Sequence, residues 1–285
     1  MICIILTEEV INKIIKNDIK CTYLNEHYVI LYKKMEAKDK DLESYFNNIK
    51  LAQESGINIP KIIEYRLLNS SKKERSNGIF VEERARGTVL NIRGLVLEEN
   101  SDYDFKKIIN EYLERMDFYL NELEKRANAS QQIYNKFLND FTSLYKFGLR
   151  PDPNSLNYLF DEDIGFTIID PYYDENNIIN KNNLFKYLIN DIYGVSRPTI
   201  IIKKETVKVF YYLPEYYKKR LKKYSNIINK KLFLAFKTFG YSEEYILKEL
   251  ANNKMRFFTE EISFESEELQ NKLKEEFKSK KTSLK

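Results

Sequence analysis

The chain has 285 residues, of which 32% are charged, and its 47 Lys and Arg against 43 Asp and Glu leave a formal net charge of +4. It is long enough to bury a core as one large domain or two lobes, and so small a net charge does not indicate a nucleic-acid binder. The presence of only two cysteines and one histidine excludes a disulfide framework and most histidine-based catalytic or zinc schemes, and without an apolar run long enough for a membrane span the sequence predicts a soluble, cytoplasmic protein.

The first third of the chain has the pattern of a small sheet with helices. The spacing of apolar residues predicts helices over 8–16 and 39–55, and Gly56 ends the second. Alternation of apolar and polar residues predicts four strands, over residues 19–24, 28–34, 62–68 and 78–83. No glycine precedes Gly56, so the turn between the first two strands lacks the residue that lets phosphate-binding loops approach closely.

From residue 102 onward the apolar spacing is that of long helices. We expect helices over 102–126 and 130–147, with Ser130 as an N-cap and Gly148 as a C-terminal stop. Further elements are predicted downstream: helices over 183–192, 213–239 and 242–250, and an extended segment over 199–210. The helix 213–239 carries a basic run, which usually marks a solvated face, consisting of Lys218, Lys219, Arg220, Lys222, Lys223, Lys230 and Lys231.

The stretch from Gly148 to Asp170 combines three oxygen-bearing side chains with a predicted β-hairpin. Asp152 is followed five residues later by Asn157, and Asp170 stands at the exit of the second strand. Transfer of a γ-phosphoryl group needs a carboxylate that orients and deprotonates the acceptor hydroxyl, and hard oxygen ligands that hold Mg²⁺ against the phosphates. A hairpin with solvated acidic turn residues is the simpler interpretation of the same stretch.

The order Asp152, Asn157, Asp170 resembles the D-x-x-x-x-N catalytic loop and the metal-binding aspartate of the protein-kinase-like superfamily. The form Ile168-Ile169-Asp170-Pro171 is closest to the aminoglycoside and choline phosphotransferase branch. The resemblance implies that Asp152 is catalytic, that Asn157 and Asp170 bind the metal, and that ATP and Mg²⁺ are the cofactors.

The same resemblance implies an α+β, two-lobed protein-kinase-like fold, with a small antiparallel-sheet N-lobe and a mainly helical C-lobe. The implied boundaries are 1–84 for the N-lobe, 85–91 for the hinge, 92–253 for the C-lobe with the catalytic hairpin 148–170, and 254–285 for a charged C-terminal tail.

A kinase-like fold also implies nucleotide contacts from the first third of the chain. Lys33 is the candidate to pair with the α/β-phosphates, with Lys34 as the alternative, and Glu43 is the candidate to pair with that lysine, with Asp41 second.

The hinge of such a fold offers backbone groups to adenine. The segment Gly78 to Leu90 resembles a hinge, and the implied groups are the carbonyl of Glu83 and the N–H of Ala85.

The resemblance implies an ATP- and Mg²⁺-dependent phosphotransferase that acts on a hydroxyl of an unidentified small-molecule or protein acceptor. Two departures favour a pseudokinase that works as a nucleotide-binding or scaffold module: the missing glycines, and Arg150 in place of the loop histidine. Nucleotidyl transfer on the same fold and an unrelated α+β protein also remain open.

Overall fold

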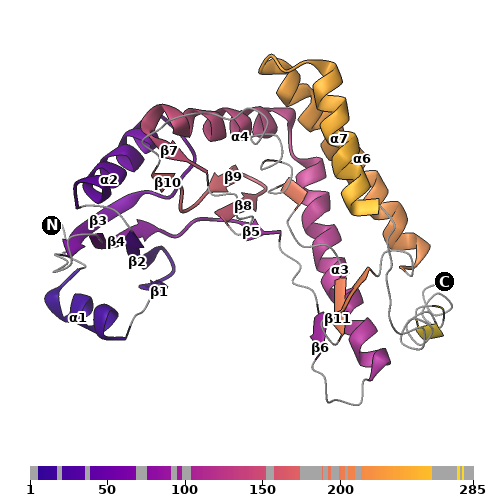
Figure 1. Ribbon diagram of the computed structural model, residues 1–285, viewed down its shortest axis with the longest axis horizontal. Helices are drawn as coiled ribbons and strands as arrows, with labels where there is room; N and C mark the ends of the chain where they lie inside the picture. Colours follow the sequence, from indigo (N-terminus) through magenta and orange to yellow (C-terminus); the bar gives the residue numbers. More distant parts are fainter. Residues whose placement is uncertain are drawn as a thin grey trace. The chain divides into compact units, whose positions relative to one another are not determined.

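Figure 1 shows the computed structural model of the chain. The structure describes residues 6–17, 21–35, 39–68, 76–90, 95–97, 104–151, 157–173, 188, 192–193, 199–202, 205–208, 213–258, 275–276 and 278. Within these ranges, only the backbone is described for residues 32–35, 39–41, 76–77, 95–97, 199–202, 205–208 and 252–258. The chain folds as two compact units, and each is described by itself: Met1–Gly87, Lys136–Asp152 and Asn157–Asn180 form the first, and Thr88–Asn135, Pro153–Leu156 and Lys181–Lys285 the second.

The first unit contains the small antiparallel sheet that the sequence predicts. Its strands are β1 (Cys21–Tyr23), β2 (Tyr28–Met35), β3 (Ile62–Leu68) and β4 (Ser76–Glu83). They lie in the order β1-β2-β4-β3, and every neighbouring pair is antiparallel. The mixed α+β class is therefore confirmed, whereas the two-lobed kinase-like fold and its boundaries stay predictions.

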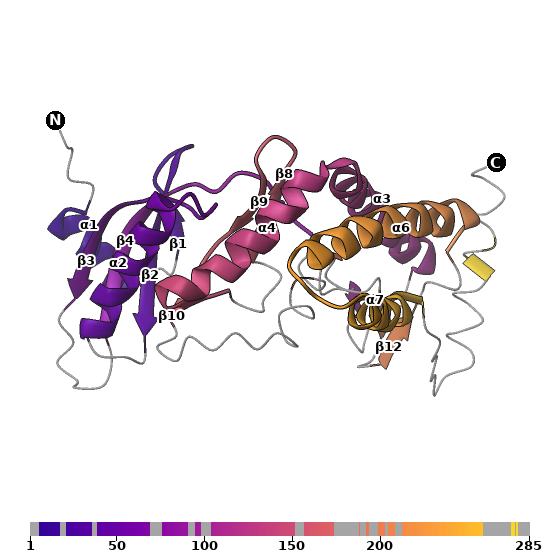
Figure 2. The same ribbon diagram turned by 90° about the horizontal axis from the view of Figure 1, so that it is seen from above.

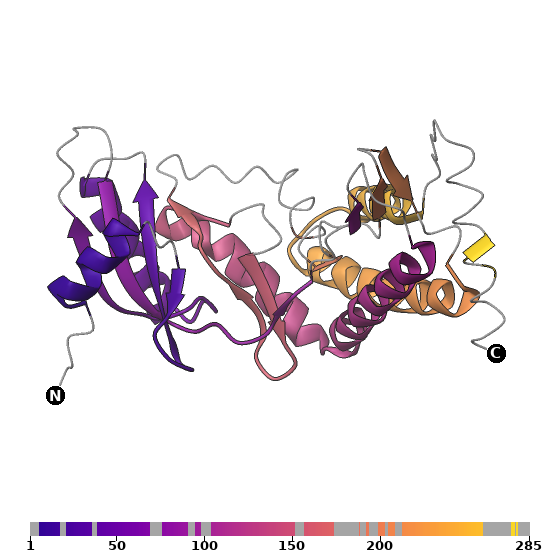
Figure 3. The same cartoon turned by 90° about the horizontal axis from the view of Figure 1, so that it is seen from below.

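One face of this sheet is covered by α1 (Glu8–Lys16), which Thr7 caps at its N-terminus. Ile11 and Ile14 of α1 pack against Ile30 of β2 and against Val81 of β4. In Figure 3 the indigo helix α1 lies in front of the strands. The position of α1 follows from the alternation of the strands, because Ile30 and Val81 are paired and therefore project from the same face.

The opposite face carries α2 (Asp39–Glu54). The ring of Phe46 meets Phe80 of β4 edge-on, with centroids 5.4 Å apart, and stacks on Tyr65 of β3 at 4.3 Å. Leu42, Phe46, Ile49 and Ala52 are all buried, as the apolar stripe predicts. Gly78 of β4 lies directly beneath this helix, since a Cβ added there would come within 2.9 Å of Leu42.

The rest of the first unit is the hairpin segment and the helix beneath it. Its elements are the second half of α4 (Gln131–Ser143), η1 (Leu144–Phe147), β7 (Leu149–Arg150), β8 (Tyr158–Asp161), β9 (Gly165–Ile168) and β10 (Tyr172–Tyr173). Gly148 ends η1 with φ 65°, which confirms it as a stop. The ring of Phe137 on α4 stacks on Phe166 of β9 at 4.4 Å, so the helix and the hairpin pack together (Figure 2).

The second unit is mainly helical. Its elements are β5 (Thr88–Val89), β6 (Leu95–Leu97), α3 (Phe105–Asn128), the first half of α4, β11 (Thr199–Ile202), β12 (Glu205–Lys208), α6 (Glu215–Thr238) and α7 (Glu243–Phe258). The segment predicted as extended over 199–210 is a hairpin of β11 and β12, and β11 also pairs in parallel with β6. The predicted helix 183–192 and the charged tail lie mostly outside the described residues.

Two members of the basic run on α6 hold α3 in place. Arg220 donates a hydrogen bond to Asn121 at 2.8 Å and forms an ion pair with Glu124 at 3.3 Å. Lys231 donates to the carbonyl of Ala127 at 2.6 Å, near the C-terminal end of α3, where the helix dipole favours a cation. The basic run is therefore only in part a solvated face, because these two cations serve the packing of the helices.

A buried ion pair within α3 is hydrogen-bonded to Thr88 of β5. Arg126 lies 3.4 Å from the carboxylate of Glu122 and donates to the carbonyl of Thr88 at 3.1 Å, while the hydroxyl of Thr88 bonds Glu122. Burial by itself would raise the pKa of Glu122, but hydrogen bonds from Lys125 and Thr88 and the charge of Arg126 outweigh it and lower that pKa. Among the described residues, no helix is both long and apolar enough to cross a membrane.

Candidate nucleotide site

A cavity of about 570 Å³ opens beside the small sheet in the first unit. Its walls come from three segments: strands β1, β2 and β4, the connecting segment 84–87, and the β8–β9 hairpin with the residues next to it. The lining residues are Cys21, Tyr23, Val29, Leu31, Phe80, Glu82, Arg84, Ala85, Gly87, Asn157, Leu159, Ile169 and Asp170. This volume is in the range of pockets that hold small molecules and cofactors.

Two apolar walls face the interior of this cavity. Leu31 of β2 and Phe80 of β4 are paired across the sheet, so their side chains share one face. Leu159 and Ile169 line the cavity from the hairpin. Apolar side chains from the sheet, one of them aromatic, and from the hairpin therefore line the same cavity, and such side chains pack well against the face of a flat ring.

The oxygen-bearing residues of the hairpin line the same cavity. Asn157 immediately precedes β8, Asp170 follows β9, and the N–H of Ile169 donates to the carbonyl of Asn157 at 2.8 Å. That bond holds the two ends of the hairpin side by side. Asn157 and Asp170 therefore line one cavity, and their role as metal ligands stays a prediction; an amide and a carboxylate are hard oxygen donors that fit Mg²⁺.

Asp170 has φ 49°, the only positive φ at a non-glycine residue in the described part of the chain. A left-handed conformation costs an L-residue about 1 kcal/mol or more, and such outliers gather at functional sites. Within the described ranges no three His, Cys, Asp or Glu side chains gather as a metal site. A metal at Asp170 would therefore need donors other than a cluster of described carboxylate, imidazole or thiolate groups, and the amide oxygen of Asn157 is one of this kind.

The connecting segment 84–87 forms the edge of the cavity, in the position that the resemblance gives to a hinge. The N–H of Glu83 donates to the carbonyl of Lys61 at 2.8 Å, and that of Arg84 donates to the carbonyl of His27 at 2.6 Å. No backbone hydrogen bond engages the N–H of Ala85 within the described residues, and Ala85 lines both this cavity and the pocket next to it, so its N–H stays the predicted hinge donor.

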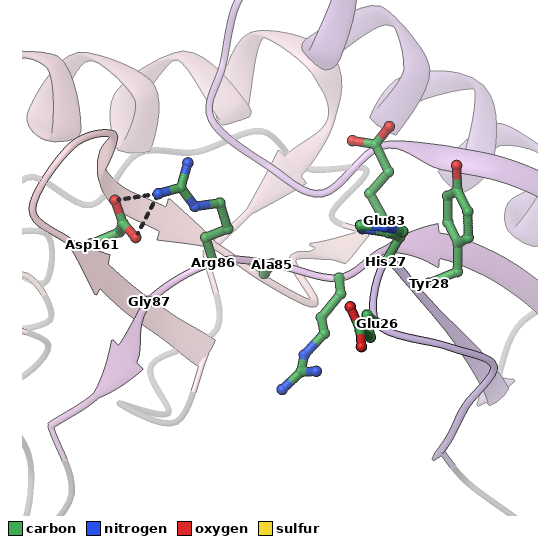
Figure 4. Close-up of a pocket in the computed structure, with 9 residues that line it drawn as sticks. Glu26, His27, Tyr28, Glu83, Ala85, Arg86, Gly87 and Asp161 are labelled. Atoms are coloured by element: carbon green, nitrogen blue, oxygen red, sulfur yellow. Dashed lines mark hydrogen bonds and ion pairs between the residues drawn. The ribbon is translucent and has the colours of Figure 1, made fainter.

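Glu83, the other predicted hinge residue, lines a neighbouring pocket of about 550 Å³ with His27 and Arg86. Figure 4 shows this pocket, in which Arg86 points toward Asp161 and pairs with it at 3.3 Å. Glu82 lines the cavity beside the small sheet instead, and sequence reasoning missed it. The alternation of side chains along this strand could have identified Glu82, since Glu82 shares a face with Phe80.

The candidates for phosphate contact lie on β2 and α2. The ladder places Lys33 opposite Gly78, the residue of β4 that lies beneath α2, and two positions after Leu31 of the cavity wall. Glu43 is exposed on the first half of α2. The side chains of Lys33, Lys34 and Asp41 lie outside the description, so the choice of the paired lysine and acid stays a prediction.

The turn between β1 and β2 belongs to the neighbouring pocket. Asn25 closes the turn by accepting hydrogen bonds from the N–H groups of His27 at 2.8 Å and Tyr28 at 3.0 Å. Glu26 and His27 line the pocket of Figure 4, and neither lines the cavity beside the small sheet.

Asp152, the predicted catalytic residue, lies outside the described residues. Arg150, two residues before Asp152, is nevertheless held in place, because β7 pairs with β10 and places Arg150 opposite Tyr172. The guanidinium of Arg150 also lies 5.4 Å from the ring centroid of Tyr172, within cation–π range. Arg150, which replaces the loop histidine of the kinase-like pattern, thus contacts the segment that follows Asp170.

Comparison of the chain with models of known protein families and with curated protein sequences finds no significant match.

Proposed function

We propose that the chain is an ATP- and Mg²⁺-dependent phosphotransferase of the protein-kinase-like kind. The observation that carries the proposal is the composition of the cavity: apolar walls from the sheet and hairpin, the N–H of Ala85 at its edge, and Asn157 with Asp170 as oxygen donors. A nucleobase would lie between the walls, and the phosphates would extend to the metal ligands.

The proposed reaction moves the γ-phosphoryl group of ATP to a hydroxyl of a small-molecule or protein acceptor. The acceptor oxygen forms a bond to the γ-phosphorus, the bond from that phosphorus to the β–γ bridging oxygen breaks, and ADP leaves. Asp152 would orient the acceptor hydroxyl and take its proton, and Asn157 and Asp170 would hold the Mg²⁺ that neutralises the phosphates.

A thermal-shift experiment with ATP, with and without Mg²⁺ or Mn²⁺, tests the binding half of the proposal. Nucleotide at 100 times its dissociation constant should stabilise the protein by about 2.7 kcal/mol. The metal should strengthen ATP binding in the wild type and not in Asp170→Ala. An Asp170→Ala variant with undiminished metal-dependent binding would remove Asp170 from the site.

The second candidate is a pseudokinase that binds nucleotide as an interaction module. It is favoured by the absence of glycine before Gly56 and by Arg150 in place of the loop histidine. Labelled ATP incubated with candidate acceptors separates the two proposals, because only the phosphotransferase releases ADP in proportion to a phosphorylated acceptor.

A further inference from the structure

Asn58 lies between α2 and β3 and bonds three successive residues of β9. Its side-chain amide donates to the carbonyl of Phe166 at 2.7 Å and to the hydroxyl of Thr167 at 3.1 Å. Its backbone carbonyl accepts from the N–H of Ile168 at 3.0 Å. One asparagine thus bonds the strand that ends two residues before Asp170.

These bonds occupy the edge of β9 that β8 leaves unpaired. β8 lies along one side of β9, with Tyr158 opposite Ile168 and Phe160 opposite Phe166. A strand edge without partners would expose unsatisfied N–H and C=O groups. Asn58 supplies one acceptor and one amide donor there, so it replaces part of a third strand.

Asn58 is itself held from α4. Its N–H donates to the carboxylate of Asp140 at 3.1 Å, and Asp140 is buried. Lys136 donates to the same carboxylate at 2.5 Å and to the carbonyl of Gly56 at 3.0 Å. Burial raises the pKa of Asp140, while the hydrogen bonds from Lys136 and Asn58 oppose that rise. The segment that follows α2 is therefore bonded to both α4 and β9.

We propose that Asn58 is a positioning residue, which holds β9 in place so that Asp170 stays aligned with Asn157 for Mg²⁺. The proposal deepens the phosphotransferase function and rests on it for the identity of the metal. Asn58 does not line the cavity, and its hydrogen bonds go to β9 and Asp140. Asn58 would orient Asp170 indirectly, by holding β9 in place, as residues that support metal ligands do.

The test compares Asn58→Ala with the wild type by two measurements. In hydrogen exchange, we expect the amides of β8 and β9 to exchange at least about tenfold faster, and those of β2 and β4 to be unchanged, because only the hairpin loses bonds. In titrations of Mg²⁺ at fixed ATP, we expect the half-saturating metal concentration to rise about tenfold, with metal-free ATP affinity unchanged.

Gln53→Ala is the matched control, because Gln53 bonds the carbonyl of Pro60 in the same loop. Gln53→Ala should change neither the hydrogen-exchange rates of the β8 and β9 amides nor the half-saturating concentration of Mg²⁺. Equal effects of Gln53→Ala and Asn58→Ala would overturn the proposal, as would an Asn58→Ala protein with the wild-type Mg²⁺ requirement.

Thr167→Val removes a single bond to Asn58, and it replaces Asn58→Ala if that variant does not fold. A smaller shift in the same direction supports the proposal, and no shift overturns it. A wild-type protein that binds no ATP with metal would overturn the phosphotransferase function and the metal role of Asn58 with it. Hydrogen exchange would still show whether Asn58 holds β9.

Discussion

Replacement of Gly87 by alanine tests how closely the connecting segment 84–87 packs against the β8–β9 hairpin. Gly87 has φ 107°, and a Cβ added to it would lie 2.6 Å from both the carbonyl carbon and the oxygen of Phe160 in β8. These are backbone atoms of a paired strand, so they cannot turn aside as a flexible side chain would. The close approach matters for the site because Gly87 and Leu159 both line the cavity.

The expected loss has two parts. Backbone strain at this φ costs about 1–3 kcal/mol, and forcing a methyl group into a packed position costs about 1–3 kcal/mol more. The free energy of unfolding should therefore fall by roughly 2–6 kcal/mol, which is a large share of the roughly 5–15 kcal/mol typical of a domain. ATP affinity should fall as well, since relief of the overlap would move the cavity edge away from the hairpin.

Gly56→Ala is the control, because Gly56 has φ 83° in the same unit but nothing lies within 4 Å of the added Cβ. It should show the strain alone, about 1–2 kcal/mol. Urea unfolding of both variants, followed by fluorescence, gives the difference. If Gly87→Ala and Gly56→Ala lose the same free energy within about 0.5 kcal/mol, the close approach of Gly87 to β8 is refuted.

Three further outcomes are expected. Asp152→Asn should bind ATP and Mg²⁺ normally but transfer phosphate about 10²–10⁴-fold more slowly in a labelled-ATP assay, and lost melting temperature with unchanged transfer would make Asp152 structural. Lys33→Ala should weaken ATP binding by at least about tenfold in calorimetry, whereas Lys34→Ala should not; the reverse result would exchange their roles. Because the pKa of Glu122 is lowered from 4.5, its ionised form adds stability that is present above that pH and is lost as pH falls through the lowered value. Urea unfolding from pH 6 to 3 should therefore show that the free energy of unfolding falls less steeply with falling pH in Glu122→Gln than in the wild type. An equally steep fall would contradict the role of this carboxylate.

The sequence by itself determined the local elements and their order. Helices α1 and α2 and the four strands of the small sheet follow from periodicity, because a buried face imposes its spacing on the chain. The end of η1 at Gly148 and the cap at Ser130 follow from residues whose backbone preferences are local. The β8–β9 hairpin follows from two apolar runs and the turn between them, whereas the metal roles that the resemblance gives to Asn157 and Asp170 stay predictions.

Only the tertiary structure decided which residues surround that site. Strand alternation is a local property, but the choice of Glu82 over Glu83 for the cavity depends on which face of β4 adjoins the cavity, and this is the face of Phe80, opposite the one that packs on α1. The roles of Arg220 and Lys231 depend on α3, about 100 residues away in sequence. Asn58 gave no signal at all, because its partners on β9 lie more than 100 residues away and its chemistry is that of any loop asparagine until the two segments meet.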